Sequence, residues 1–321
     1  GGDRVTPRVS VVVTTRGRPQ LVGRAVASAL AQTLRELEVI VVLDGPDPAT
    51  LAALRELEDA RVRLHVRDAR GGQAAAINSG VALARGAFAA MLDDDDEWLP
   101  DKLAVQLAAA EASAHARPVV GCRFLARSEA DDVAWPLRRP RAGEPACEYL
   151  FCRTMLAFGE GIVPTSMLLA PTDLFRRHPM AEDLPKHCDL DWLLRVDRLP
   201  DVALVLPADP RPLAIWQQQA GRHRLSNVHD WRFSYAWVGR ARDAGDVSAR
   251  AYAGFLLTWV SFSARVQRDR GAFAFLVKEA LRRGHPSALE LAVHAGVWGM
   301  PSLLRARASR ALARRGHAHA L

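Results

Sequence analysis

The sequence lacks the cysteine pairs and glycine-rich loops that mark several common classes of protein. Its four cysteines form no CxxC pair, so neither a zinc ribbon nor a thioredoxin-type site is predicted, and we expect reduced thiols in a cytoplasmic protein. No GxGxxG motif and no P-loop follow a predicted strand, which argues against a nicotinamide dehydrogenase and a P-loop NTPase. No apolar run approaches the roughly 18 residues of a transmembrane helix, so we expect a chain that is soluble or at most membrane-peripheral.

Lysine is also scarce, although the chain as a whole is basic. The 321 residues are 49% hydrophobic and 25% charged, which is an ordinary globular composition. The net charge of +7 comes mainly from arginine, because lysine occurs only as Lys102, Lys186 and Lys278. A basic chain suits nucleic acid, an anionic membrane surface or phosphorylated substrates, and arginine binds diphosphates through its planar fork. No recognition-helix or RNP-type motif is present, so we expect no nucleic-acid partner.

Short β-branched runs alternate with helical patterns over the first 92 residues. Strands are predicted at 8–15, 37–43, 62–66 and 87–92, and helices at 19–32, 48–57 and 71–84. This alternation with short connections predicts an α/β fold with a doubly wound, mostly parallel sheet flanked by helices. In such sheets ligands bind at the carboxyl ends of the strands.

Four consecutive aspartates, Asp93 to Asp96, follow the predicted strand at 87–92 directly. Each close carboxylate pair costs roughly 4 kcal/mol at about 4 Å and an effective dielectric of about 20. A divalent cation carrying a diphosphate would relieve this repulsion, because hard oxygen ligands suit Mg²⁺ or Mn²⁺. A solvated acidic turn is the alternative interpretation.

Polar side chains follow each of the four predicted strands and are expected to share one edge of the sheet. They are Thr14, Thr15, Arg16 and Arg18, then Asp44, then Arg67 and Asp68, then the four aspartates. Structural interpretations remain open for some of them: Thr14 and Thr15 can simply end a strand, and Arg67 can be a surface residue. Asn78, in the helix at 71–84, can likewise bond to a neighbouring loop.

The second half of the chain is less regular. We predict a helix at 99–112, a strand at 118–125, a loop at 128–146 and a strand at 165–170. From 228 onward the pattern is rich in Ala, Leu and Arg and predicts about five helices. The expected domains are therefore 1–228, for nucleotide-sugar binding and catalysis, and an all-helical appendage at 229–321.

The N-terminal segments together resemble a family-2 glycosyltransferase with the GT-A fold. The resemblance rests on four stretches in order, which are Val9 to Pro19, Glu38 to Gly45, Ala76 to Gly86 and Leu92 to Trp98. It covers roughly residues 8–230. The resemblance implies a metal-dependent, inverting glycosyltransferase of the hexosyltransferase type, with Mg²⁺ or Mn²⁺ as cofactor.

The resemblance also implies roles for individual residues. Thr14, Arg16 and Asp44 would line the base and ribose pocket, with Asp44 accepting a hydrogen bond from a uracil-type N–H. Asp93 and Asp95 would form the DXD motif, with Asp93 on ribose or diphosphate and Asp95 on the metal. Asp96 would support the metal, and the remaining donor-binding residues would be Thr15, Arg18, Arg67, Asn78 and Asp94. The family usually has two acidic residues where this chain has Leu43 and Asp44, so uracil, thymine and guanine all remain open.

The family's catalytic motif, Glu-Asp-x-Asp-x-x-x-Arg, matches Cys188 to Arg195 with cysteine in place of glutamate. The resemblance makes Asp189 the general base that takes the acceptor hydroxyl proton, with Asp191 as the alternative base. Asp189 as a helix N-cap is the structural interpretation. His187 is expected to be a structural histidine rather than a ligand.

Two basic segments complete the prediction. Arg222 and His223 resemble the segment that closes over the diphosphate, although a solvated basic loop is an equal alternative. The helix predicted at 302–315 carries five arginines and either contacts an anionic membrane surface or forms a solvated face.

The predicted partners are a nucleotide-sugar donor, UDP-sugar favoured, and a hydroxyl acceptor that is a glycan, lipid-linked or a small molecule. A catalytically silent nucleotide-sugar or polyanion binder, and a nucleotidyltransferase, are the alternative functions.

Overall fold

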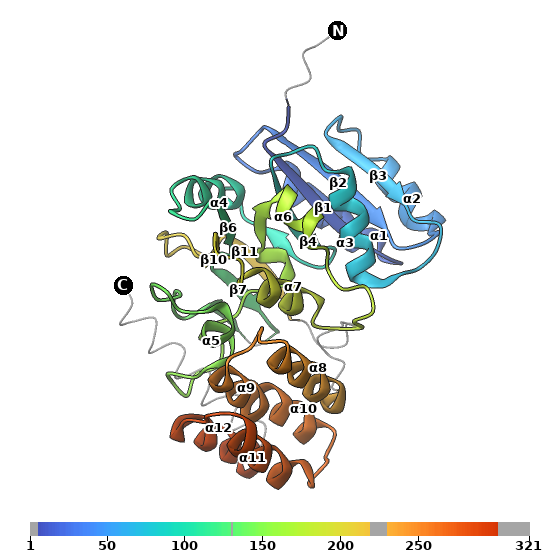
Figure 1. Cartoon of the computed structure of the whole chain (residues 1–321). Helices are drawn as coiled ribbons and strands as arrows, with labels where there is room; N and C mark the ends of the chain where they lie inside the picture. The colour runs from blue at the N-terminus through green and yellow to red at the C-terminus, as the bar shows by residue number, and fades with distance from the viewer. Residues whose placement is uncertain (1–5, 130, 219–229, 301–321) are drawn as a thin grey trace. The chain divides into compact units, whose positions relative to one another are not determined.

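The computed structural model describes residues 6–129, 131–218 and 230–300, which form two compact units (Figure 1). The first unit takes the residues up to 134 together with 163–220, and the second takes 135–162 together with those from 221 onward. The two units divide the chain differently from the expected domains, because residues 135–162 group with the helices. A domain boundary between residues 228 and 229 stays a prediction.

A seven-stranded sheet of order β10-β6-β9-β4-β1-β2-β3 forms the centre of the first unit. Strand β1 pairs in parallel with β2 and β4, and β2 pairs in parallel with β3, whereas β9 runs antiparallel to β4 and β6. The predicted α/β class with a mostly parallel sheet is therefore confirmed. Its elements are β1 Val9–Thr15, α1 Pro19–Leu30, β2 Leu37–Leu43, α2 Pro48–Arg55, β3 Val62–Val66, α3 Gly72–Leu83, β4 Phe88–Asp93, α4 Lys102–Glu111, β6 Arg117–Val120, η1 Thr165–Met167, β9 Leu169–Pro171, α6 Thr172–Arg177, α7 Cys188–Val196 and β10 Val202–Val205.

Hydrophobic burial explains why the central strands form where the sequence predicts them. Every residue of β2 and nearly every residue of β1 is buried, as expected for parallel strands that are covered on both faces. Helix α3 lies close against this sheet at Gly80, where an added Cβ would lie 2.4 Å from a methyl group of Val12. The missing side chain lets α3 approach the sheet and fixes where its N-terminus meets the strand ends.

A second, four-stranded sheet of order β5-β11-β7-β8 completes the strands of the first unit. Three predictions were wrong in detail here. The strand predicted at 118–125 is split at Gly121 into β6 and β7, and the loop predicted at 128–146 contains β8. The strand predicted at 165–170 begins as the 3₁₀ turn η1, because its hydroxyl side chains bond to distant carboxylates. The bounds of the second sheet are β5 Glu97–Trp98, β7 Phe124–Arg127, β8 Asp132–Trp135 and β11 Ala214–Gln217.

The second unit is helical, which confirms the predicted helical region over residues 230–300. Its helix boundaries include N-caps by Asp230 and Ser248 and a capping box between Ser287 and Glu290. The elements are α5 Ala146–Phe151, α8 Trp231–Asp243, α9 Ala249–Phe255, the π-helical turn η3 Leu256–Val260, α10 Ser261–Val266, α11 Ala272–Arg283 and α12 Ala288–Gly299.

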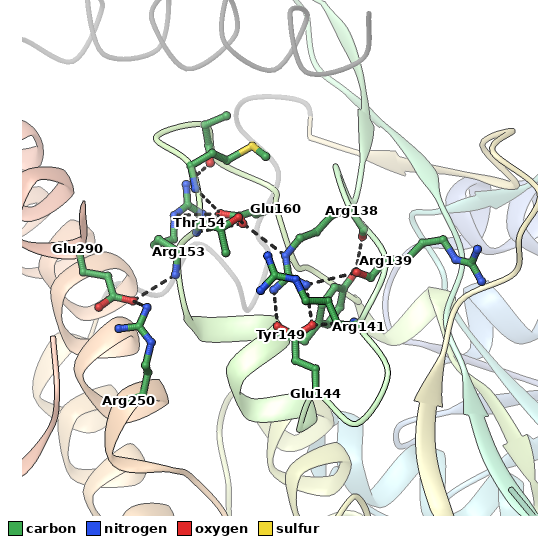
Figure 2. A network of polar contacts seen from close by, with 12 residues as sticks. Arg138, Arg139, Arg141, Glu144, Tyr149, Arg153, Thr154, Glu160, Arg250 and Glu290 are labelled. Atoms are coloured by element: carbon green, nitrogen blue, oxygen red, sulfur yellow. Dashed lines mark hydrogen bonds and ion pairs between the residues drawn. The ribbon is translucent and has the colours of Figure 1, made fainter. Parts of the chain in front are cut away.

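A buried network of charges ties residues 138–160 into the helical unit (Figure 2). The Glu160 side chain is 1% exposed and accepts hydrogen bonds from the backbone N–H of Thr154, while the Arg138 Nε lies 3.3 Å from its Oε1. Glu290, at the start of α12, accepts from the backbone N–H of Arg153 at 3.1 Å. Because buried carboxylates are costly unless they are paired, these contacts hold the segment against the helices.

Candidate active site

The carboxyl ends of the central strands meet at one edge of the sheet, as the sequence predicts. The strand register pairs Thr14 with Asp93, and Thr15 with Leu43 directly before Asp44. The chain winds outward from β1 to β3 and then crosses back to β4, so β1 and β4 flank the point where the strand order reverses. Ligands of open α/β sheets bind at this switch point.

The four aspartates that follow β4 are held by different partners. Asp94 accepts hydrogen bonds from the Thr15 hydroxyl at 2.8 Å and from Arg18 Nη1 at 2.9 Å. The same Arg18 nitrogen lies 3.8 Å from Asp95 Oδ2. The interpretation of the run as a solvated acidic turn is wrong, because Asp94, Asp95 and Asp96 are all buried.

Asp96 does not fit the metal-supporting role predicted for it. Its side chain is 0% exposed and accepts hydrogen bonds from the Ser166 hydroxyl at 2.7 Å and from the Gln217 backbone N–H at 3.2 Å. Both carboxylate oxygens are therefore engaged inside the protein, and Asp96 joins the acidic run to η1 and β11.

The η1 turn bridges the acidic run and helix α7 through two adjacent hydroxyl groups. The Ser166 Oγ accepts the Asp93 backbone N–H at 3.0 Å while donating to Asp96. The Thr165 hydroxyl donates to Asp189 Oδ2 at 2.8 Å. One short turn thus fixes the carboxylates predicted for the donor site and the one predicted for catalysis.

The carboxyl group of Asp93 is crowded by other carboxylates. Burial and the neighbouring aspartates of the run raise the pKa of Asp93 well above its usual value, and the charge of Asp189 acts in the same direction. Burial also raises the pKa of Asp94, although Arg18 and the Thr15 hydroxyl oppose this. The Gln73 amide in the first turn of α3 donates to Asp93 Oδ1 at 2.7 Å. Asp93 is therefore held in place by an amide, and no side-chain cation within residues 6–129, 131–218 and 230–300 forms an ion pair with it.

Asp44 organises the loop between β3 and α3. Its carboxylate is 8% exposed and accepts hydrogen bonds from the backbone N–H of Gly71 at 2.8 Å and of Gly72 at 2.9 Å. Arg67 Nη1 donates to Asp44 Oδ1 at 2.6 Å, so Arg67 is an ion-pair partner rather than a surface residue. Gly72 has a φ of +87°, which favours glycine at this point.

Helix α7 presents both predicted catalytic carboxylates in its first turn. His187 occupies the N-cap position with a left-handed backbone (φ 68°), so the interpretation of Asp189 as the N-cap is wrong. Asp191 pairs with Arg195 at 2.8 Å. Asp189 instead meets Thr165, which distinguishes the two carboxylates and favours Asp189 as the base.

Two neighbours of Asp189 are neutral at pH 7. Burial, together with the charge of Lys186, lowers the pKa of His187 to about 3, which agrees with a structural histidine. Burial and the charge of Asp189 raise the pKa of the Cys188 thiol, whose sulfur lies 3.9 Å from Gln73 Oε1. Cys188 therefore stands where the family motif has a glutamate without adding negative charge to the site.

Asn78 bonds to a neighbouring loop, as its structural interpretation proposes. Its side-chain amide donates to the Met180 carbonyl and to Glu182, each at 2.9 Å, and accepts the Met180 N–H at 3.0 Å. All the hydrogen bonds described for Asn78 thus hold the segment that leads into α7, so donor contact through this amide is not supported.

The remaining predicted residues fall into two groups. Arg16 is exposed in the loop after β1, where the next N–H, of Gly17, donates to Asp47 at 2.6 Å. Arg222, His223 and the basic helix predicted at 302–315 lie outside the described residues. Within the described residues, no helix is long and apolar enough to cross a membrane.

The donor set suits a cation that is shared with a substrate. Among the described residues, no group of three or more His, Cys, Asp or Glu side chains is arranged to hold a metal ion alone. Mg²⁺ is usually bound through one or two carboxylates together with substrate phosphates and water. Asp93 and Asp95 match that pattern, because they supply oxygen ligands and the crowded charge at Asp93 would be relieved by a cation.

Three residues of this site were missed at the sequence level. Gln73, Thr165 and Ser166 each bond to a predicted carboxylate. Gln73 directly follows the two glycines that start α3, which was a usable signal. The residues themselves predicted Thr165 and Ser166 only as the start of a strand, and the carboxylates to which they bond lie in distant segments of the chain.

Comparison with known proteins places the chain among glycosyltransferases. The model of the family "Glycosyl transferase family 2" matches residues 10–177, more than half of the chain. The succinoglycan biosynthesis protein ExoO of Rhizobium meliloti is 39% identical over 107 residues, covering 33% of this chain and 31% of that protein. The UDP-Glc:alpha-D-GlcNAc-diphosphoundecaprenol beta-1,3-glucosyltransferase WfgD of Escherichia coli is 30% identical over 99 residues, covering 31% of this chain and 39% of that protein. The match thus spans about a third of the length of these relatives.

Solved structures share the fold over most of the chain. S. aureus TarS 1–349 in complex with UDP-GlcNAc has a TM-score of 0.58 at 15% identity, covering 91% of this chain and 90% of that one. The mannosyltransferase PcManGT from Pyrobaculum calidifontis, in complex with GDP-Man and Mn²⁺, has a TM-score of 0.50 at 20% identity, covering 98% of this chain and 80% of that one.

Proposed function

The chain belongs to glycosyl transferase family 2 and is a glycosyltransferase, and we propose that it transfers a sugar from a UDP-sugar to a hydroxyl acceptor with inversion. WfgD is named as a glucosyltransferase that uses UDP-Glc, and the TarS structure is a complex with UDP-GlcNAc, which supports uracil as the base. The PcManGT structure is a complex with GDP-Man, so turnover of a GDP-sugar instead of a UDP-sugar would contradict uracil as the base.

The observation that carries the proposal is the η1 turn, which fixes Asp93 and Asp189 at one strand edge. In the proposed reaction the acceptor oxygen attacks the anomeric carbon from the face opposite the diphosphate. Its proton passes to a carboxylate oxygen of Asp189 as the new C–O bond forms. The bond from the anomeric carbon to the diphosphate oxygen breaks, and the nucleoside diphosphate leaves with the electron pair.

The placement of Asp189 suits a general base. It lies in the first turn of α7, where the positive end of the helix stabilises a negatively charged side chain. Its Oδ1 accepts the Leu190 N–H at 2.8 Å and its Oδ2 accepts the Thr165 hydroxyl. Each oxygen keeps a lone pair, so a proton can be accepted without breaking these contacts.

We propose Asp93 and Asp95 as the residues that hold Mg²⁺ or Mn²⁺. The ion would offset the negative charge that develops on the departing diphosphate. Arg18 pairs with Asp94 at 2.9 Å and lies 3.8 Å from Asp95, so we propose Asp94 as a support of this site rather than as a ligand of the ion. We propose that Thr14, Thr15, Arg16, Asp44 and Arg67 shape the base and ribose pocket, and that Arg222 and His223 neutralise the leaving nucleotide.

The acceptor and the location of the protein are further proposals. The diphosphoundecaprenol acceptor for which WfgD is named supports a lipid-linked acceptor. We propose a cytoplasmic protein that reaches such an acceptor by peripheral contact through the basic helix predicted at 302–315.

A substrate screen followed by paired variants tests this function. UDP- and GDP-sugars are first screened for thermal stabilisation with and without Mn²⁺, and the best donor is then assayed for hydrolysis and transfer. Asp189→Asn should lower turnover by about 10²–10⁴-fold, the usual contribution of a general base. Asp191→Asn is the matched control, one helical turn away from Arg195, and should lose far less.

Two outcomes would contradict the proposal. Wild-type turnover in Asp189→Asn would exclude this residue as the base. Tight nucleotide-sugar binding without turnover of any donor would instead favour the alternative of a catalytically silent binder, for which Cys188 in the catalytic motif is the motivating observation.

A further inference from the structure

A lysine is completely buried behind the candidate active site. Lys102 is the first residue of α4, and its side chain is 0% exposed. Its Nζ donates to Gln106 Oε1 at 2.7 Å and lies 3.8 Å from the centroid of the Trp98 ring. Its hydrogen-bond partner is thus a neutral amide, an aromatic face lies next to it, and the Cys122 thiol is near enough to interact with it electrostatically.

The side chains of Trp98 and Gln106 both bond to the η1 turn. Trp98 Nε1 donates to the Ser166 carbonyl at 2.9 Å. The Gln106 amide donates to the Met167 carbonyl and to the Val120 carbonyl, each at 2.8 Å. Lys102 therefore supports, through two side chains, the backbone of the turn whose hydroxyl groups hold Asp93, Asp96 and Asp189.

Stability alone does not account for an amine at this position. A buried charge is costly, and an apolar side chain of similar volume is often neutral or stabilising in its place. Burial lowers the pKa of Lys102 to about 8, so the protonated form still prevails at pH 7. In that form the ammonium is attracted to the face of the Trp98 ring and orients the Gln106 carbonyl oxygen, which turns the amide nitrogen toward the two backbone carbonyls.

We propose that Lys102 is a positioning residue of the active site, which acts through Trp98 and Gln106 on the η1 turn. It touches neither donor nor acceptor. Its effect on the reaction rests on the proposed function, because the carboxylates that it positions are the proposed ligand and base. Its effect on the geometry of the turn does not depend on that function.

Lys102→Met tests the proposal, because methionine has a similar length and no charge. Turnover should fall by about tenfold to a hundredfold, as expected when catalytic groups are displaced by up to about 1 Å. The donor KM should change much less, and the melting temperature should equal or exceed that of the wild type. Lys278→Met, at an exposed lysine of α11, is the control and should change neither turnover nor stability.

Hydrogen exchange gives a readout that needs no substrate. The Asp93 N–H bonds to the Ser166 hydroxyl, so peptides covering residues 88–98 should exchange faster in Lys102→Met than in Lys278→Met. If the variant does not fold, Lys102→Gln keeps a polar group near Gln106 and removes the charge. Unchanged exchange would overturn the proposal, and so would a lower melting temperature with unchanged turnover, which would mark a purely structural lysine. If the wild type transfers no sugar, the proposed function is wrong. The hydrogen-exchange result still decides whether Lys102 positions the η1 turn.

Discussion

Replacing Ser166 with alanine removes the hydroxyl group on which the acidic run depends. Ser166 is 0% exposed, and its hydroxyl accepts the Asp93 N–H and donates to Asp96. A hydrogen bond to a charged group contributes about 1.5–3 kcal/mol and a neutral one about 0.5–1.5 kcal/mol. Ser166→Ala should therefore lower the free energy of unfolding by about 2–4 kcal/mol, because Asp96 stays buried and the Asp93 N–H loses its acceptor.

Urea unfolding and thermal melting measure this loss directly. At about 2–4 °C per kcal/mol for a unit of this size, the melting temperature should fall by roughly 4–16 °C. Turnover should fall as well, since the Asp93 backbone loses its anchor. Ser79→Ala is the matched control, because the Ser79 hydroxyl bonds only to the Ala75 carbonyl within α3 among its described contacts. Its effect should stay below about 1 kcal/mol.

The reasoning would be refuted if Ser166→Ala unfolded like Ser79→Ala. That result would mean that Asp96 and the Asp93 N–H find replacement partners without cost. A loss of turnover with unchanged stability would refute it differently, because it would show that the hydroxyl contacts the substrate rather than the acidic run.

Three further predictions concern Lys102, Asp44 and Asn78. Burial lowers the pKa of Lys102 to about 8. Between about pH 8 and 10.4 the lysine is therefore protonated in the unfolded chain but largely neutral in the folded one, so the free energy of unfolding rises with pH by up to roughly 3 kcal/mol. This rise should appear in urea unfolding as the difference between wild type and Lys102→Met, and a flat difference would contradict it. Burial raises the pKa of the nearby Cys122 thiol to about 11 in the wild type, against the opposing charge of Lys102. Asp44→Asn should weaken nucleotide binding about tenfold or more by titration calorimetry, because it loses charge-assisted bonds to the Gly71 loop, and unchanged affinity would assign Asp44 a role outside the pocket. Asn78→Ala should lower the free energy of unfolding, measured by thermal melting, by about 1–3 kcal/mol and leave the donor affinity unchanged. A loss of donor affinity without a loss of stability would show that Asn78 contacts the donor.

The first half of the fold could be predicted because hydrophobic burial alone determines it. The strands around Val11, Ile40 and Leu92 are apolar on both faces, and proline or glycine marks the start of each helix between them. The split at Gly121 and the turn at Thr165 could not be predicted in this way. Both depend on tertiary partners, since the chain leaves the first sheet after Val120 and the Thr165 hydroxyl finds Asp189, 24 residues away.

The site was predicted only as far as strand order determines it. The chain alternates strand and helix, so the residues that follow parallel strands had to share an edge, and Thr14 does lie beside Asp93. Which side chains act directly is a different question, because it depends on hydrogen bonds between distant segments. Asn78 stands in a stretch that resembles the family, yet it bonds to Met180, 102 residues further along the chain.

The acidic run shows why residue type alone could not settle that question. Four identical carboxylates follow one strand, but Arg18 and Thr15 hold Asp94, while Ser166 and the Gln217 backbone hold Asp96. These internal contacts hold the carboxylates of Asp94 and Asp96 within the protein. Asp93 keeps a raised pKa because it is buried and because the neighbouring carboxylates crowd it. At the proposed cation site, the contacts from β1, η1 and β11, rather than the length of the run, therefore decide which carboxylates the protein holds internally.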